Sequence, residues 1–337
     1  MNSLKYKIQL ATEKDECIWN NYLKTKKKNI PINYFSWSKI VSSIFMFQKP
    51  LYLMVKDQKG DIRGLLCSFI VSSITGNKKL YSSRFGMVVD NEEVSKILFE
   101  HIENFCKKSK IDDFVITSGF IKYSSRLHCF EKISMTLQLN KNIECLWGSL
   151  SSKTRNTIRR GYKNEFEFSS DEKYLNGFFK VYKKRMTNKK LSSLPLSYFK
   201  AILKKNTSSS KLFVALKNKE VIAGLILLYS KNGAQYTYAA DDNAIFKNNM
   251  HCLLWEVIKF LYKKNIRFFD MTESTKNSGV YYFKKFFGCN EQKVYYYSNK
   301  KTATFSSNKI SQRNESISLK LISFFKNKLS IQFSRII

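Results

Sequence analysis

The stretch VYYFKKFFGC, from Val280 to Cys289, contains the residue types in this sequence that are best suited to chemistry. It keeps Lys284 and Lys285 side by side among three phenylalanines and two tyrosines. A core strand does not hold adjacent lysines, and a surface helix does not need so many aromatic rings. A positive charge fixed in such surroundings acts on a nearby negative charge more strongly than one in water. The stretch indicates either a site enclosed by aromatic side chains or a short amphipathic helix with surface lysines.

Four carboxylates lie where strand patterns end, namely Asp241, Asp242, Asp270 and Glu273. Open α/β sheets bind their ligands at strand ends, so these residues are candidates for a base or for substrate contacts. Asp270 interrupts the apolar run RFFDM, and its charge needs a partner, for which Lys284 or Arg267 is available. The alternative is a structural ion pair, or a cap on the following turn.

Two basic or polar segments are candidates for binding an anion. Residues 243–254, NAIFKNNMHCLL, form a turn before a helix and contain no glycine. A backbone phosphate nest is therefore disfavoured there, and side chains would have to bind instead: Lys247, Asn248 and Asn249. Within 146–169 we expect a helix capped by Ser149 or Ser151 and ending at Gly161.

Arg155 and Arg159 lie four residues apart on that helix, on one face with Tyr162. Two guanidinium groups at this spacing can grip a phosphate or a carboxylate. The alternative is a solvated basic face that binds nothing.

A repeat organises the chain. Residues 51–66 and 211–226 both read as an apolar strand, a polar turn and a second strand entered by a glycine, at Gly64 and Gly224 (224 − 64 = 160). Residues 94–119 and 253–274 both read as an amphipathic helix, a basic turn and a short strand. The repeat predicts an α/β (α+β) fold with two tandem domains, each a mixed central sheet flanked by helices. We expect domains at 1–146 and 147–300, with a helical insertion at 172–205.

The composition limits the compartment and the cofactors. The seven cysteines are scattered and no CxxC occurs, which favours reduced thiols in a cytoplasm. The three histidines lie far apart, so no metal site is expected. No apolar run reaches 18 residues, and the N-terminus lacks the apolar region of a signal peptide. The basic tail, 301–337, fits a helix packed on the second domain, with contact to an anionic inner membrane surface as the alternative.

The net charge of +33 favours an anionic partner without identifying one. Lysine accounts for 49 of the 59 basic residues and arginine for 10. An excess of lysine follows from the codon usage of an AT-rich genome whatever the function. Arginine placement is therefore the sharper signal, and Arg155, Arg159, Arg160 and Arg185 lie close together in the sequence.

Several stretches together resemble the Fem-type branch of the GNAT-fold acyltransferases, over roughly residues 5–300. They are the basic helix LWGSLSSKTRNTIRRGYK, the segment RMTNKKLSSLPLSYFKAIL, and FFDMTES followed by YYFKKFFG. The resemblance implies a single transfer of an acyl group from a thioester or an aminoacyl-tRNA ester to an amine, without a covalent enzyme intermediate. It also implies that the Lys284 ammonium and the Phe283 backbone N–H lie near the donor ester. Tyr281 and Tyr282 are candidates for protonating the leaving group, although ring packing is the favoured alternative.

Three functions remain open at this point. The first is an N-acyltransferase that uses acyl-CoA and acts on an amino sugar or precursor of bacterial envelope polysaccharide. The second is an aminoacyltransferase that uses aminoacyl-tRNA and a peptidoglycan precursor, favoured by the turn without glycine. The third is a non-catalytic RNA- or membrane-binding protein.

In the first copy of the repeat, Asp90, Glu92 and Glu93 occupy the turn that corresponds to residues 243–254, and they would repel phosphate. The first domain is therefore expected to shape the acceptor cleft.

Overall fold

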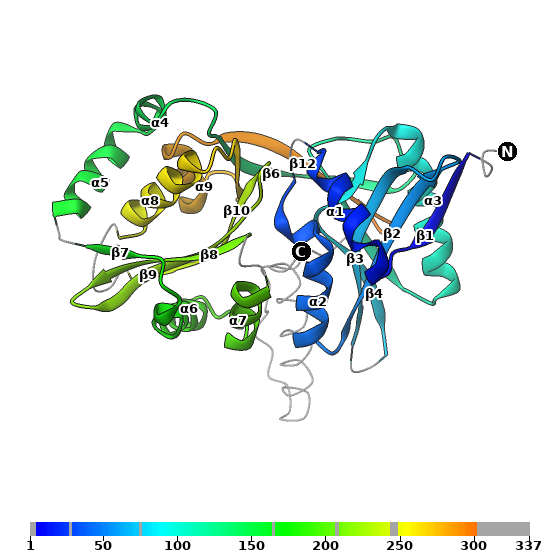
Figure 1. Ribbon diagram of the computed structural model, residues 1–337, viewed down its shortest axis with the longest axis horizontal. Coiled ribbons are helices and arrows are strands. Elements are labelled where there is room, and N and C mark those ends of the chain that lie inside the picture. Colours follow the sequence, from blue (N-terminus) through cyan, green and yellow to red (C-terminus); the bar gives the residue numbers. More distant parts are fainter. Residues whose placement is uncertain are drawn as a thin grey trace. The chain divides into compact units, whose positions relative to one another are not determined.

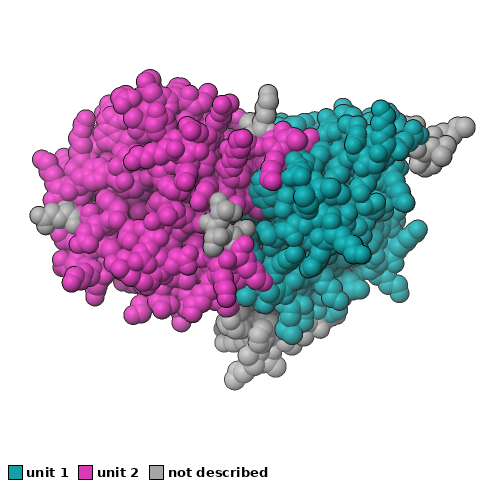
Figure 2. All heavy atoms as spheres, viewed as in Figure 1, with its two compact units in different colours: residues 1–23, 32–131, 294–337 teal, residues 24–31, 132–293 magenta. Residues whose placement is uncertain are grey.

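The computed structural model describes residues 5–26, 29–73, 76–163, 166–205, 209–242 and 249–301. Within it the chain divides into two compact units (Figures 1 and 2). Unit 1 contains residues 1–23, 32–131 and 294–337, and unit 2 contains 24–31 and 132–293. The expected tail, apart from residue 301, lies outside the described residues.

Unit 1 is a mixed sheet with its helices, formed from the N-terminal part of the chain. Its elements are β1 (Tyr6–Leu10), α1 (Glu16–Lys24), α2 (Phe35–Ile44), β2 (Gln48–Asp57), β3 (Ile62–Ser72), β4 (Lys78–Val89), α3 (Glu92–Lys108) and β5 (Asp113–Gly119). Strands β1 to β4 pair antiparallel in chain order, and β5 joins β4 in parallel. The helix α3 makes the crossover that a parallel pair requires.

Unit 2 repeats this order of elements. They are α4 (Ile143–Ser149), α5 (Ser152–Lys163), β7 (Glu167–Ser169), α6 (Leu175–Asn188), α7 (Leu196–Lys205), β8 (Ser210–Lys217), β9 (Glu220–Tyr229), β10 (Ala234–Asp241), α8 (Asn249–Lys263), β11 (Phe268–Glu273) and α9 (Gly279–Phe286). The series β1-α1-α2-β2-β3-β4-α3-β5 matches β7-α6-α7-β8-β9-β10-α8-β11. The expected duplication of a mixed α/β unit is confirmed.

The match also corrects the reading of residues 172–205. They form α6 and α7, which stand in the repeat where α1 and α2 stand in unit 1. Both helices pack on the sheet through aromatic rings, among them Phe199 against Tyr238 at 5.3 Å. This segment is therefore part of the repeated unit and not an insertion into it.

Two strands are exchanged between the copies. β6 (His128–Gln138) follows β5 in the chain, yet it pairs with β11 of unit 2, with Leu137 opposite Phe269. β12 (Asn290–Ser298) follows α9, yet it pairs with β5 of unit 1, with Tyr297 opposite Ile116. The unit boundaries at 131/132 and 293/294 therefore differ from the expected 146/147 and 300/301. The strands of each copy are therefore extended by a strand that follows the other copy in the sequence.

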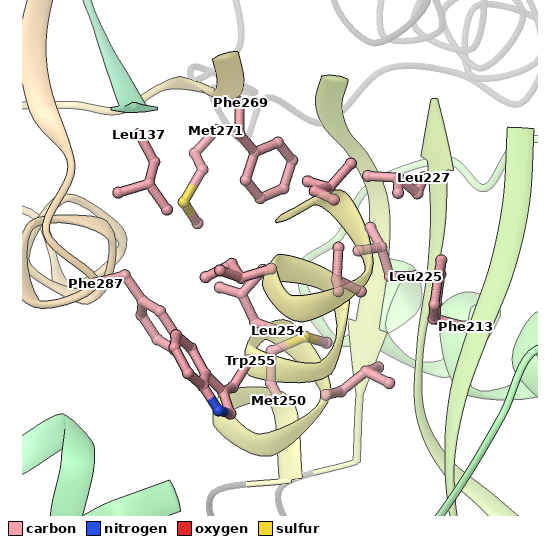
Figure 3. Close-up of a cluster of buried hydrophobic side chains, with 14 of the residues drawn as sticks. Leu137, Phe213, Leu225, Leu227, Met250, Leu254, Trp255, Phe269, Met271 and Phe287 are labelled. Atoms are coloured by element: carbon pink, nitrogen blue, oxygen red, sulfur yellow. The ribbon is translucent and has the colours of Figure 1, made fainter. Parts of the chain in front are cut away.

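The core of unit 2 surrounds α8 (Figure 3). Apolar side chains reach this helix from four strands, for example Phe213, Leu225, Phe269 and Leu137. Helices α5, α8 and α9 cover one face of this sheet, and α6 and α7 cover the other (Figure 1). Because both faces are covered, the strands β8 to β11 are apolar over most of their length.

The contact between α5 and α8 explains a glycine that the sequence suggested as a helix end. A side-chain carbon at Gly161 would lie 2.0 Å from the Cys252 sulfur. Gly161 lies inside α5, which runs on to Lys163, so the expected stop there is wrong. The start of α5 is capped by Ser151, whose hydroxyl accepts the Thr154 N–H at 3.1 Å.

Candidate active site

The parallel strands β10 and β11 separate soon after they meet. Only Ala234 with Phe269 and Gln235 with Asp270 are register partners, although the strands continue to Asp241 and Glu273. Beyond that point β10 stays with β9, and β11 stays with β6. The carboxyl ends of parallel strands are where α/β sheets bind ligands. The place where these strands diverge is therefore the candidate site.

A bulge marks the end of β11 at this place. The register with β6 shifts between Asp270 and Glu273. Between them Thr272 has a φ of +64°, a left-handed conformation that is strained for a β-branched residue. Strained residues of this kind persist only where their surroundings hold them, and they cluster at functional sites.

Asp270 holds the bulge from one side. Its side chain is fully buried, and Oδ1 accepts hydrogen bonds from the Ser134 hydroxyl at 2.8 Å and the Thr272 N–H at 3.0 Å. These donors provide partners for the carboxylate that interrupts the apolar run. Because Asp270 is buried, its carboxylate contacts the backbone of the bulge at Thr272.

Lys284 holds the bulge from the other side. Only 2% of this residue is exposed, and its Nζ donates to the backbone oxygens of Thr272 at 3.1 Å and Glu273 at 3.0 Å. The Thr272 hydroxyl lies 3.4 Å from the same nitrogen. The aromatic stretch thus places one ammonium group on consecutive carbonyls of a strained turn. Its neighbour Lys285 is exposed. A direct contact of Lys284 with the donor ester stays a prediction.

The aromatic residues of α9 face in two directions. The Phe283 ring packs edge-on against the His251 imidazole, with centroids 5.0 Å apart, and against Phe287 at 5.1 Å. Tyr282 is 40% exposed and donates to Asn277 Oδ1 at 3.3 Å. Tyr281 is buried and donates to Glu291. Of the two candidate proton donors, Tyr282 is the accessible one.

The other carboxylates differ in how far a substrate can reach them. Asp241 forms an ion pair with Arg185 and keeps 6% of its side chain exposed. Asp242 pairs with Lys184 at 2.6 Å. Glu273 keeps 24% of its side chain exposed and lies 3.4 Å from Lys132 Nζ. At this edge Glu273 is more accessible than Asp241, Asp242 or Asp270.

The two arginines of α5 have different surroundings. Arg155 donates from Nη1 to the backbone oxygens of Gly148 at 3.0 Å and Leu150 at 2.5 Å, so it closes the end of α4. Arg159 is exposed, and its guanidinium lies 5.6 Å from the Trp147 ring centroid. Stacking on an aromatic face leaves the edge of a guanidinium available for an anion. Arg159 therefore fits the expected anion contact better than Arg155.

Of the expected phosphate-binding residues, Asn249 alone is described, because Lys247 and Asn248 lie outside the described residues. Asn249 is fully buried at the start of α8. Its Nδ2 donates to the Ile222 oxygen at 3.2 Å, and its Oδ1 accepts the Met250 N–H at 2.6 Å. The amide therefore fixes the beginning of α8, and a contact with a ligand stays a prediction.

His251 lies two residues further along α8. From the sequence alone, this histidine is weighed only as a metal ligand. Its ring packs against Phe283 and, at 5.7 Å between centroids, Phe287. Burial lowers the pKa of this imidazole to about 4, so it is neutral at physiological pH. The signal in the sequence that could have singled it out is its position in the first turn of α8, directly after the candidate phosphate-binding segment. In the part of the chain that the structure describes, no cluster of three metal-ligating side chains occurs.

Comparisons with solved structures agree with this architecture. The chain is similar to FemX, with 15% identity, 87% of this chain and 98% of that chain covered, and a TM-score of 0.68. It is similar to the C-terminal domain of a putative lysylphosphatidylglycerol synthetase from Agrobacterium fabrum (12%, 85% and 92%, 0.58). It is also similar to a tandem GNAT protein from the clavulanic acid biosynthesis pathway (8%, 88% and 100%, 0.54). The expected tandem GNAT fold is confirmed.

No protein-family model matches the sequence, and no curated protein matches it. Among the described residues, no helix combines the length and apolar character needed to cross a membrane.

Proposed function

We propose that this chain is an N-acyltransferase that moves an acyl group from acyl-CoA to an amine. The donor binds in unit 2, where β10 and β11 diverge. The acceptor is an amino sugar or another amine-bearing precursor of the bacterial cell envelope, and the reaction takes place in the cytoplasm. The likeness to FemX and to a lysylphosphatidylglycerol synthetase supports a group transfer in the envelope.

The divergence of β10 from β11 carries this proposal. Register pairing stops after Gln235 and Asp270, so the backbone groups beyond them are not used between these two strands. Buried side chains, Asp270 and Lys284, fix the end of β11 in a strained form. Strained, firmly anchored turns cluster at sites where they orient groups for a ligand, which supports a ligand site here.

The reaction is a direct attack. The amine lone pair forms a bond to the carbonyl carbon, a tetrahedral oxyanion develops, and the carbon–sulfur bond breaks with release of the CoA thiol. The amine loses one proton, and the thiolate gains one. Glu273 accepts the proton from the amine, because it is the most accessible of the carboxylates at this edge. Tyr282 is the accessible hydroxyl on α9 that can return a proton to sulfur.

Lys284 acts on this reaction by holding Thr272 and Glu273 in place. Its ammonium lies against their carbonyl oxygens, so the same contact positions the proposed base. Its charge, held out of water, also favours negative charge developing at this edge of the sheet. Phe283 closes the site toward α8 with its ring. Asp241, paired with Arg185, keeps the end of β10 attached to α6.

Aminoacyl-tRNA is the second candidate donor, and the basic face of α5 favours it. Lys153, Arg159, Arg160 and Lys163 are exposed along this helix. Arg159 lies over Trp147, a combination of charge and aromatic surface that suits nucleic acid. The turn at 243–248 contains no glycine, which disfavours a backbone nest for the CoA pyrophosphate.

Release of CoA thiol in the presence of amines tests the proposal. The native chain is incubated with acetyl-CoA and amino sugars, alone and as nucleotide conjugates. We expect amine-dependent thiol release, reduced about 100-fold by Glu273→Gln. Glu220→Gln is the matched control, because Glu220 is an exposed carboxylate at the start of β9. Release that no amine stimulates, together with aminoacyl transfer from charged tRNA, would replace acyl-CoA by the second donor.

A further inference from the structure

We propose that the imidazole of His251 contacts the acyl donor and donates a hydrogen bond to its reacting carbonyl oxygen. This inference rests on the proposed function and adds a catalytic residue to it. It begins with where α8 starts. β10 and β11 are parallel, and α8 follows β10, so the first turn of α8 lies at the edge where both strands end. His251 is the third residue of α8.

The ring of His251 is held by the same helix that provides Lys284. Phe283 meets the imidazole edge-on, with 79° between the ring planes, and Phe287 lies at 31° to it. Phe287 is fully buried in the core of unit 2, so this support is rigid (Figure 3). Phe283 directly precedes Lys284 in α9, so one short helix positions both the imidazole and the bulge of β11.

Among the described residues, the polar edge of the imidazole has no contact that uses it. Between described residues, in 5–301 with their gaps, no hydrogen bond is made by either ring nitrogen of His251. The side chain nonetheless remains partly exposed. Buried polar groups are almost always hydrogen-bonded, so the nitrogens of this partly exposed ring are available to water or to a ligand. The fixed ring therefore presents a donor and an acceptor to a molecule that enters the site.

Because the His251 imidazole is neutral, it suits the role of a hydrogen-bond donor better than that of a base. A neutral imidazole carries one N–H donor and is a weak base when its pKa is low. The N–H of such a group can donate a hydrogen bond to a carbonyl oxygen as negative charge develops there, while the imidazole keeps its proton. The removal of one donor of this kind typically costs about 100-fold or more in rate. This leaves the proton of the amine to Glu273.

Histidine NMR tests the inference with controls built into the chain. The protein contains three histidines, and His101 and His128 belong to unit 1. The chain is labelled with [15N]histidine, and the His251 signals are assigned with His251→Gln. Acetonyl-CoA, a thioether that keeps the carbonyl but cannot transfer its acyl group, is added to saturation as measured by calorimetry. We expect the His251 signals to move while those of His101 and His128 do not. S-ethyl-CoA, which lacks the carbonyl, moves them less.

Activity gives a second readout. We expect His251→Phe, which keeps a planar ring for packing, to lower kcat about 100-fold with KM within about twofold. His251→Gln keeps a side-chain N–H and retains most of kcat. An unmoved His251 signal at saturation, or full activity of His251→Phe, overturns this inference alone. If neither acetonyl-CoA nor an RNA minihelix carrying an amide-linked amino acid binds, the proposed function fails, and this inference fails with it.

Discussion

One buried ammonium group, that of Lys284, fixes the end of β11. In the sequence this lysine stands among aromatic residues, but composition cannot reveal what its ammonium group contacts. The contacts are backbone oxygens of Thr272 and Glu273, which come from a bulge with no sequence signature. Threonine rarely adopts a positive φ, so residue propensity does not predict the conformation of Thr272. Tertiary contacts impose it.

Replacing Lys284 by methionine tests this anchoring. The change leaves carbonyl acceptors buried without a donor, so we expect a loss of about 2–4 kcal/mol in the free energy of unfolding. Lys285→Met, at the adjacent exposed position, should change it by no more than about 0.5 kcal/mol. Urea denaturation at constant pH measures both. Equal effects of the two substitutions would show that Lys284 does not anchor the bulge.

His251 predicts how stability depends on pH. The folded-state pKa is about 4, and the unfolded value is about 6.5, so the unfolded chain binds the extra proton between these values. The stability that neutral His251 contributes is therefore present above pH 6.5 and is lost as the pH falls toward 4. We expect a decrease of up to about 3 kcal/mol from this residue. Denaturation of the native chain and of His251→Gln at pH 7 and pH 4.5 isolates it. A pH dependence unchanged by the substitution would contradict the assigned pKa.

Among the elements, helices and strands with strong periodicity were predictable and their contacts were not. The amphipathic stripes of α3 and α8 and the hairpins β2–β3 and β8–β9 follow from residue patterns, and all four are confirmed. Because glycine commonly ends helices, the sequence predicts a helix end at Gly161. Gly161 instead lies inside α5, where Cys252 of α8 approaches closely. The sequence of α5 alone does not reveal this contact.

The contact between α5 and α8 can be tested with a pair of substitutions. Gly161→Ala places a methyl group 2.0 Å from the Cys252 sulfur, so the helices must shift or the thiol must rotate. We expect a loss of about 1–3 kcal/mol in the free energy of unfolding. Adding Cys252→Ala removes the sulfur and should recover part of that loss, because the Cys252 Cβ lies at 3.7 Å. Thermal unfolding of the native, single and double variants gives the coupling. Strict additivity would mean that the two residues do not meet.

For the whole molecule, internal repetition predicted two similar units but not the exchange of strands between them. The repeat was visible because Gly64 and Gly224 enter equivalent strands. The pattern of residues in β6 and β12 does not say which strand each one pairs with. The expected boundary at 146/147 therefore leaves β6 with the wrong copy.

Separate expression of residues 1–146 and 147–301 tests the exchange. The first fragment lacks β12, which leaves an edge of β5 unpaired, and the second lacks β6, which does the same to β11. Unpaired buried edges favour aggregation, so we expect neither fragment alone to unfold cooperatively. Co-expression should restore a soluble complex with one transition by circular dichroism. A cooperative transition in either isolated fragment would contradict the exchange.

The most direct test of the account is hydrogen exchange with and without saturating acetyl-CoA, read by mass spectrometry. We expect protection in peptides that cover β10, the start of α8, β11 and α9 in unit 2, and none over the equivalent β4, α3 and β5 in unit 1. A second arm with an aminoacyl-RNA minihelix reports the alternative donor at the same elements. If neither donor protects unit 2, or if protection falls on unit 1, the placement of the donor site at the divergence of β10 and β11 is wrong.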